Sequence, residues 1–127
     1  MDLEQRIRRD RDVLARLGIT VDERVDERFA LRMDVAADML NAGGVCHGGL
    51  LYALADTAGA YALADAGVSP VTVDANITYL QAARLNDEVA ATAEVVRTGR
   101  RFGHCEVRLA LADGSLVAIY RASCANI

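Results

Sequence analysis

Lysine is missing from this sequence of 127 residues, and all 14 of its basic residues are arginine. Its absence excludes Schiff-base catalysis, a P-loop lysine that binds phosphate, and a lysine general base. Tryptophan is also absent, and aromatic residues make up only 5% of the chain. Because 53% of the residues are hydrophobic and 25% are charged, the composition predicts a globular domain with a core of Ala, Val, Leu and Ile.

The sequence contains no apolar run of about 18 residues or more, so it predicts no transmembrane helix. Its first residues, Met1 to Arg6, lack the apolar core of a signal peptide. The net charge of −4 and the pI of about 5.1 have the wrong sign for a protein that binds a phosphate backbone. These features predict a cytoplasmic protein with neither a nucleic acid nor a membrane as its partner.

Cysteine and histidine are scarce. The three cysteines, Cys46, Cys105 and Cys124, are an odd number with long spacings, which fits neither a disulfide framework nor a zinc site. With His47 and His104 as the two histidines, a histidine-rich metal site is not expected. The sequence therefore predicts a reducing compartment and no metal.

Charge is distributed unevenly along the chain. Residues 1–34 are crowded with Asp, Glu and Arg, whereas residues 35–83 contain no basic residue at all. No internal repeat or low-complexity linker separates these regions. The sequence therefore predicts one domain over residues 1–127, with its middle buried.

Apolar residues at near-helical spacing from Leu3 to Leu17 predict a charged surface helix that Gly18 ends. From Ile19 to Val35, apolar and charged residues alternate, which indicates one or two strands. Residues 50–64 are good helix formers and apolar on nearly every face. They predict a buried helix that carries Asp56 near its middle.

The C-terminal half predicts an antiparallel sheet. Residues 71–79 alternate apolar and polar side chains, as in a strand whose apolar side is buried. Residues 88–97 and 102–111 are expected to pair, and Asp113-Gly114 indicates a tight hairpin before a last strand from Leu116 to about Ser123. The predicted fold is α+β, with one long buried helix facing an antiparallel sheet and inserted before the long strands.

Asp56 is the main candidate for catalysis. A carboxylate inside an apolar helix is partly desolvated, which is costly unless the group is hydrogen-bonded or paired. No basic residue lies within a helical turn or two of it in the sequence, so Asp56 is interpreted as a general base or a nucleophile. The alternative is a structural carboxylate that a loop amide or a strand residue satisfies.

His47, Gly48 and Gly49 stand at the start of the same helix. Free N–H groups in a first helical turn attract negative charge, and glycines let a ligand approach them closely. The segment can serve as an oxyanion hole for a carbonyl under attack. The alternative is an ordinary glycine-rich helix start.

Helix geometry separates these two candidates. Gly48 and Asp56 lie roughly 12 Å apart along one helix axis, so one small carbonyl cannot touch both within a single chain. If they act together, two copies of the helix must lie antiparallel, with Gly48 of one copy facing Asp56 of the other. A catalytic role for this pair therefore predicts an obligate two-fold dimer with two equivalent sites.

Other residues are weaker candidates. Cys46 beside His47 suggests a thiol–imidazole pair, although adjacent side chains rarely meet well. Asn41 can orient a water or shape a turn. Three arginines around Gly99 can grip a phosphate of an extended ligand or form a solvated hairpin tip. They are Arg97, Arg100 and Arg101.

Two segments resemble the signature of hotdog-fold acyl-CoA thioesterases. Met39–Gly49 reads MLNAGGVCHGG, and Leu54–Ala58 reads LADTA. The spacing between the Asn, the His, the Gly and the Asp of these segments matches that family without a gap, and the similarity extends through nearly the whole chain. Within the family, the sequence most resembles the phenylacetate-degradation group called PaaI. It departs from many relatives at residues 80–83, which read LQAA in place of a Leu-Arg-Pro-Gly turn.

The resemblance implies a hotdog fold, in which an antiparallel sheet wraps a long helix, and dimers that pair into tetramers with active sites at the dimer interface. It implies that Asp56 is the nucleophile or the general base for water. The Gly48 N–H of the partner chain would polarise the thioester carbonyl, with Asn41 and His47 helping to position the carbonyl or the water. The residues expected to contact the substrate or its coenzyme A are Gly49, Thr57, Arg97, Arg100 and Arg101.

The resemblance thus predicts an enzyme that hydrolyses an acyl-CoA thioester, with an aromatic or arylacetyl group, to the free acid and coenzyme A. Coenzyme A is part of the substrate, so no cofactor is expected. Two alternatives are a hotdog dehydratase or hydratase and a non-catalytic module that binds acyl-CoA. Small residues in the predicted helix would leave room for a ring beside it or allow a close helix–helix contact. They are Ala53, Ala58, Gly59 and Ala60.

Overall fold

Two short helices, α1 (Leu3–Arg9) and α2 (Arg11–Leu17), open the chain in the computed structural model, which describes residues 1–22 and 28–127. The prediction of one continuous helix is wrong, because α1 ends at Arg9 and α2 begins at Arg11, with Asp10 as the cap residue between them at φ −85° and ψ −2°. The Asp10 carboxylate accepts a hydrogen bond of 2.6 Å from the Tyr61 hydroxyl. Gly18 ends α2 with φ 66°, as predicted.

The Tyr61–Asp10 bond ties the N-terminal helices to the central helix, and Tyr61→Phe tests its contribution. We expect the free energy of unfolding to fall by about 1–2 kcal/mol, because a hydrogen bond to a charged group is lost and little packing changes. Urea unfolding followed by circular dichroism, at matched protein concentrations, measures the difference. An unchanged midpoint and slope would show that the bond contributes nothing.

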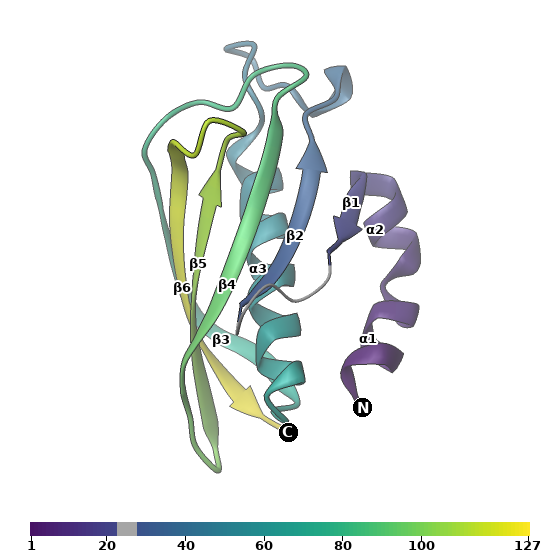
Figure 1. Ribbon diagram of the computed structural model, residues 1–127, viewed down its shortest axis with the longest axis vertical. Helices are drawn as coiled ribbons and strands as arrows, with labels where there is room; N and C mark the ends of the chain where they lie inside the picture. Colours follow the sequence, from purple (N-terminus) through teal and green to yellow (C-terminus); the bar gives the residue numbers. More distant parts are fainter. Residues whose placement is uncertain (23–27) are drawn as a thin grey trace.

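A curved antiparallel sheet wraps one long helix (Figure 1). Its strand order is β1-β2-β4-β5-β6-β3. The strands are β1 (Ile19–Val21), β2 (Phe29–Asp34), β3 (Pro70–Tyr79), β4 (Glu88–Thr98), β5 (Phe102–Ala110) and β6 (Leu116–Asn126), with a short 3-10 helix at Ala37–Met39. The long helix is α3 (Gly48–Asp65). The predicted α+β fold is confirmed, as are the strands expected within 19–35, apart from residues 23–27, which lie outside the described ranges.

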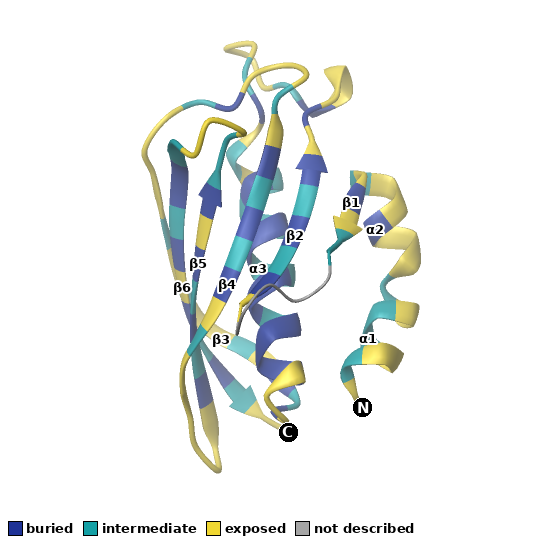
Figure 2. Cartoon of the chain, viewed as in Figure 1, coloured by how far each residue is buried: buried dark blue, intermediate teal, exposed yellow. Residues whose placement is uncertain are grey.

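The core lies between α3 and the sheet. Buried residues occur along α3 and alternate with more exposed ones along β2, β4 and β5 (Figure 2). A Cβ at Gly59 of α3 would lie 2.7 Å from Cys105 Sγ, and one at Gly103 of β5 would lie 2.8 Å from Leu63 Cδ2. These two glycines therefore allow α3 and β5 to approach closely. None of the helices in the described ranges has the length and apolar character needed to cross a membrane.

A β-bulge at Val73 changes which residues of β3 face the helix. Thr72 pairs with Cys124 of β6, but Asp74 pairs with the neighbouring Ser123, so Val73 is the extra residue. The expectation that the valines of β3 are buried is therefore wrong. Val71 is 45% exposed and Val73 57% exposed, whereas Thr72 reaches α3.

Candidate active site

The Asp56 carboxylate on α3 is held on one side by the sheet. Its Oδ1 accepts a hydrogen bond of 2.5 Å from the Tyr120 hydroxyl and one of 3.0 Å from Thr72 Oγ1. Its Oδ2 accepts no hydrogen bond from any described residue, and the side chain is half-buried. Asp56 thus has no basic partner near it in the sequence, but it has two hydroxyl partners from distant strands. Hydroxyls of two strand residues satisfy Oδ1, as expected for a structural carboxylate, and leave Oδ2 available for a hydrogen bond to a ligand or water.

Both hydroxyls are fixed as donors to Asp56. Burial and the bond to Asp56 raise the pKa of Tyr120, so its phenol stays protonated in neutral solution. Because an ionised carboxylate can only accept, the single proton of Thr72 goes to Asp56. The 3.6 Å contact between Thr72 Oγ1 and Cys124 Sγ then takes its hydrogen from the thiol. Thr72 and Tyr120 were not predicted from the sequence, since neither residue belongs to a local motif.

The start of α3 leaves one backbone donor unused. His47 is the N-cap residue, with φ −60° and ψ 131°, and its Nδ1 accepts the Gly49 N–H at 3.1 Å. The ring proton of neutral His47 is therefore on Nε2. With Gly49 engaged in this way, the Gly48 N–H is left without an acceptor among residues 1–22 and 28–127. A donor of this kind at a helix N-terminus suits an anionic oxygen.

Tyr79 of β3 packs against this helix start. Its hydroxyl donates to the Gly48 carbonyl at 2.7 Å, and a Cβ at position 48 would lie 3.1 Å from the Tyr79 ring. Glycine at this position therefore permits the contact. Gly48 and Tyr79 line a groove of about 320 Å³ together with the apolar side chains of Leu51 and Leu80.

Asn41 shapes the loop before the helix. Its Oδ1 accepts the backbone N–H groups of Gly43 at 2.9 Å and Val45 at 3.2 Å, so the turn interpretation accounts for its oxygen. Its Nδ2 has no hydrogen-bond partner in the described chain, so this group remains able to donate to a water. Asn41 also lines the groove at Gly48.

Cys46 does not form a thiol–imidazole pair with His47. Its Sγ contacts the His47 carbonyl at 3.7 Å, while the His47 ring accepts from Gly49. Burial raises the pKa of the Cys46 thiol, which disfavours the reactive thiolate. The suggested thiol–imidazole pair is therefore not formed.

The remaining predicted residues lie on α3 and at the far hairpin. Thr57 is half-buried and its hydroxyl donates to the Ala53 carbonyl at 2.7 Å. The exposed arginines belong to β4 and the turn before β5, at the end of the molecule opposite the start of α3 (Figure 1). They are Arg97, Arg100 and Arg101. One chain therefore does not bring them to the Gly48 groove.

The small residues of α3 divide between its two sides. Ala58 and Gly59 are buried, and Gly59 lies against Cys105 and Val107. Only Ala53 and Ala60 are half-buried. The interpretation that Gly59 makes room for a ligand ring is therefore wrong, because this glycine serves the contact between helix and sheet.

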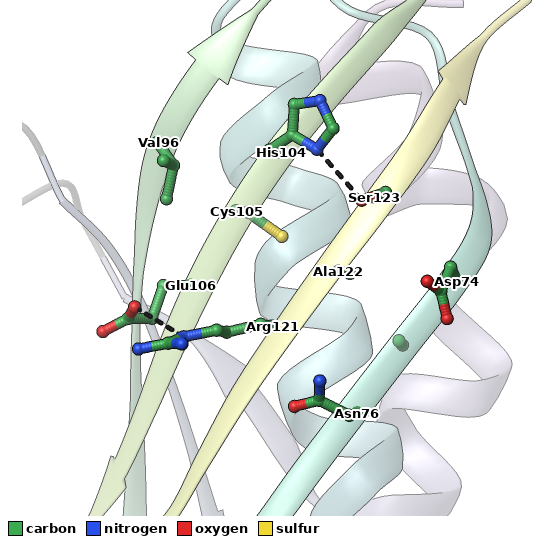
Figure 3. A pocket seen from close by; sticks show the side chains of 10 residues that line it. Asp74, Asn76, Val96, His104, Cys105, Glu106, Arg121, Ala122 and Ser123 are labelled. Atoms are coloured by element: carbon green, nitrogen blue, oxygen red, sulfur yellow. Dashed lines mark hydrogen bonds and ion pairs between the residues drawn. The ribbon is translucent and has the colours of Figure 1, made fainter.

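A second depression, of about 420 Å³, lies on the outer face of the sheet (Figure 3). His104 Nδ1 and Ser123 Oγ lie 3.0 Å apart there, and Asp74 pairs with Ser123 across the strands. Across the strands, these three side chains follow in the order Asp74, Ser123, His104. A hydrolytic triad needs the histidine between the serine and the aspartate, so this arrangement is not one. No group of three metal-ligating side chains occurs within the described ranges.

Comparisons with known proteins agree on one family. The sequence matches the profile of the Thioesterase superfamily over residues 43–118. It is 38% identical over 106 residues to acyl-coenzyme A thioesterase PaaI of Escherichia coli, covering 83% of this chain and 75% of that protein. It is 34% identical over 103 residues to human acyl-coenzyme A thioesterase 13, covering 79% and 74%.

A solved structure is also similar throughout. The structure of the Escherichia coli PaaI protein from the phenylacetic acid degradation operon superposes with a TM-score of 0.90 at 30% identity, covering 98% of this chain and 90% of that chain. The hotdog fold implied by the sequence resemblance is thereby confirmed.

Proposed function

The chain belongs to the thioesterase superfamily, and from this premise we propose that it hydrolyses acyl-CoA thioesters to a free acid and coenzyme A. The observation that carries the proposal is the pair of unused groups on α3. One is Oδ2 of Asp56, which can accept a proton or attack a carbonyl. The other is the Gly48 N–H, which can stabilise an oxyanion. A module that only binds its ligand needs neither group.

Hydrolysis uses these two groups at different atoms of the thioester. Either Asp56 takes a proton from a water whose oxygen bonds to the carbonyl carbon, or the carboxylate itself attacks that carbon and water later releases the acid. In both routes, negative charge develops on the carbonyl oxygen, to which the Gly48 N–H donates. The C–S bond then breaks and the sulfur leaves as the coenzyme A thiolate.

A two-fold dimer is needed to bring these groups together, since they are separated along one helix. β3 is suited to such a dimer because it forms an edge of the sheet, and its free side is ten residues long. Exposed apolar side chains at Val71, Val73 and Tyr79 would be covered by a second β3. Antiparallel pairing of two such edges would set the two copies of α3 antiparallel. We propose that these dimers pair into tetramers.

The acyl group is proposed to be aromatic or arylacetyl. The Escherichia coli relative comes from a phenylacetic acid degradation operon, and the groove at Gly48 has apolar walls at Leu51, Leu80 and Tyr79. Ala53 and Ala60 on the half-buried side of α3 add little bulk. We propose that the assembled oligomer brings the exposed arginines near Gly99 to a bound substrate, where they contact the nucleotide of its coenzyme A.

A panel of acyl-CoA substrates tests the function. Acetyl-, hexanoyl-, benzoyl- and phenylacetyl-CoA and one enoyl-CoA, crotonyl-CoA, are incubated with the protein, and thiol release and loss of the enoyl double bond are followed. We expect turnover, with the highest kcat/KM for an aromatic ester, and light scattering should give four times the chain mass of 13.6 kDa. Binding without turnover would support the binding module, and water addition to an enoyl-CoA without thiol release would support the hydratase.

A further inference from the structure

We infer that Tyr120 is a positioning residue for the reaction, and that its bond to Oδ1 of Asp56 makes Oδ2 the reacting oxygen. The inference rests on the proposed function, because it requires Asp56 to be the reacting carboxylate. It adds a residue that the thioesterase-like motifs do not contain, since Tyr120 lies 64 residues after Asp56 in the chain.

The two oxygens of Asp56 have different surroundings. Oδ1 receives both described hydrogen bonds, from Tyr120 at 2.5 Å and from Thr72 at 3.0 Å. Short bonds to an ionised acceptor are the strong ones, and each withdraws electron density from the oxygen that receives it. Oδ2 receives none from the described chain. The carboxylate is therefore held in one orientation, and its unbonded oxygen is the better base and nucleophile.

Tyr120 is better fixed than Thr72. Its side chain is 1% exposed, and the Tyr52 ring packs on it edge-to-face with 5.4 Å between centroids. It projects from β6, which is paired on both sides, by β5 and β3. Thr72 instead lies beside the bulge of the edge strand. A rigid donor keeps a catalytic group within the narrow range of orientations that reaction requires.

The charge state of Asp56 depends on the groups that face it. Besides Tyr120 and Thr72, the neighbouring titratable groups are Cys124 of β6 and Cys105 of β5. Tyr52 on α3 acts through Tyr120, and Arg6 of α1 acts on Cys124. A Tyr120→Phe substitution leaves all of these in place. It removes only a hydrogen bond that favours the ionised carboxylate, so protonation inactivates the variant at a higher pH.

Tyr120→Phe is therefore compared with Tyr61→Phe in full kinetic and pH profiles. Tyr61 is an equally buried tyrosine, 1% exposed, whose hydroxyl also bonds a carboxylate, at 2.6 Å, but at Asp10. For Tyr120→Phe we expect kcat to fall by about 10- to 100-fold with KM within about twofold. The acid limb of kcat against pH should move up by about one unit. Tyr61→Phe should leave both unchanged.

Asp56→Asn, measured in parallel, separates this inference from the proposed function. If Asp56→Asn retains activity, the proposed function of Asp56 fails and the inference fails with it. If Asp56→Asn is inactive while Tyr120→Phe keeps the wild-type kcat and acid limb, only the inference is overturned. Equal effects of Tyr61→Phe and Tyr120→Phe would also overturn it, since they would show a general loss of packing.

A variant with the opposite expected sign covers the case in which Tyr120→Phe does not fold. 3-Fluorotyrosine incorporated at position 120 alone keeps the shape of the side chain and makes its phenol a stronger donor. The acid limb should then move to lower pH, because the ionised carboxylate is further stabilised. An unmoved limb would overturn the inference.

Discussion

Asp56→Asn is expected to lower kcat for acyl-CoA hydrolysis by about 10³-fold, because an amide can neither take a proton from water nor attack the thioester. The amide oxygen can still accept the bonds from Tyr120 and Thr72 that Oδ1 accepts now. Folding and dimerisation should therefore be retained. Steady-state kinetics and light scattering on the same sample measure both properties.

Asp12→Asn is the matched control for this substitution. It removes the same charge from α2, where the Asp12 side chain is 97% exposed, and should leave kcat unchanged. Turnover of Asp56→Asn at close to the wild-type rate would show that Asp56 is a structural residue. The hydroxyls of the sheet would then merely satisfy a polar group at the helix surface.

Gly48→Pro should lower kcat by about 10²- to 10³-fold, the usual cost of removing one oxyanion donor. Gly48 is the first residue of α3, where proline is tolerated because no bond within the helix needs the N–H that it removes. The preceding His47 already has the extended conformation, with φ −60° and ψ 131°, that proline requires of its neighbour. The helix should therefore begin at the same residue.

Gly48→Ala separates the missing donor from the added bulk. Both variants place a Cβ about 3.1 Å from the Tyr79 ring, so both must displace that exposed side chain slightly. Only the proline variant lacks the N–H. A loss of activity confined to Gly48→Pro supports the oxyanion role, and equal losses in both variants would assign the effect to crowding at Tyr79.

The sequence predicted those features that depend on local pattern. The long helix, its Gly48 start and the strands of the C-terminal half follow from periodicity and turn residues, and the motif spacing made Asp56 the candidate carboxylate. The break at Asp10 was missed, and so was the hydrogen bond of its carboxylate to the hydroxyl of Tyr61, which is 51 residues distant in the chain. Contacts of this range depend on tertiary packing and leave no local pattern.

The partners of Asp56 were missed for a related reason. They depend on strand register, and the bulge at Val73, which turns Thr72 toward α3, has no local sequence signal. The face of α3 that packs on the sheet could not be predicted either, because a helix that is apolar on nearly every face does not indicate which side meets the sheet. The misinterpretation of Gly59 followed from that ambiguity.

Complementation between two inactive variants tests the central claim that one site takes Gly48 from one chain and Asp56 from the other. Chains carrying Asp56→Asn and chains carrying Gly48→Pro are coexpressed, so that half of the randomly formed dimers are mixed. Each mixed dimer has one site with both residues intact and one site with neither, so the mixture should regain about a quarter of the wild-type activity. A mixture no more active than the separate variants would contradict the shared site.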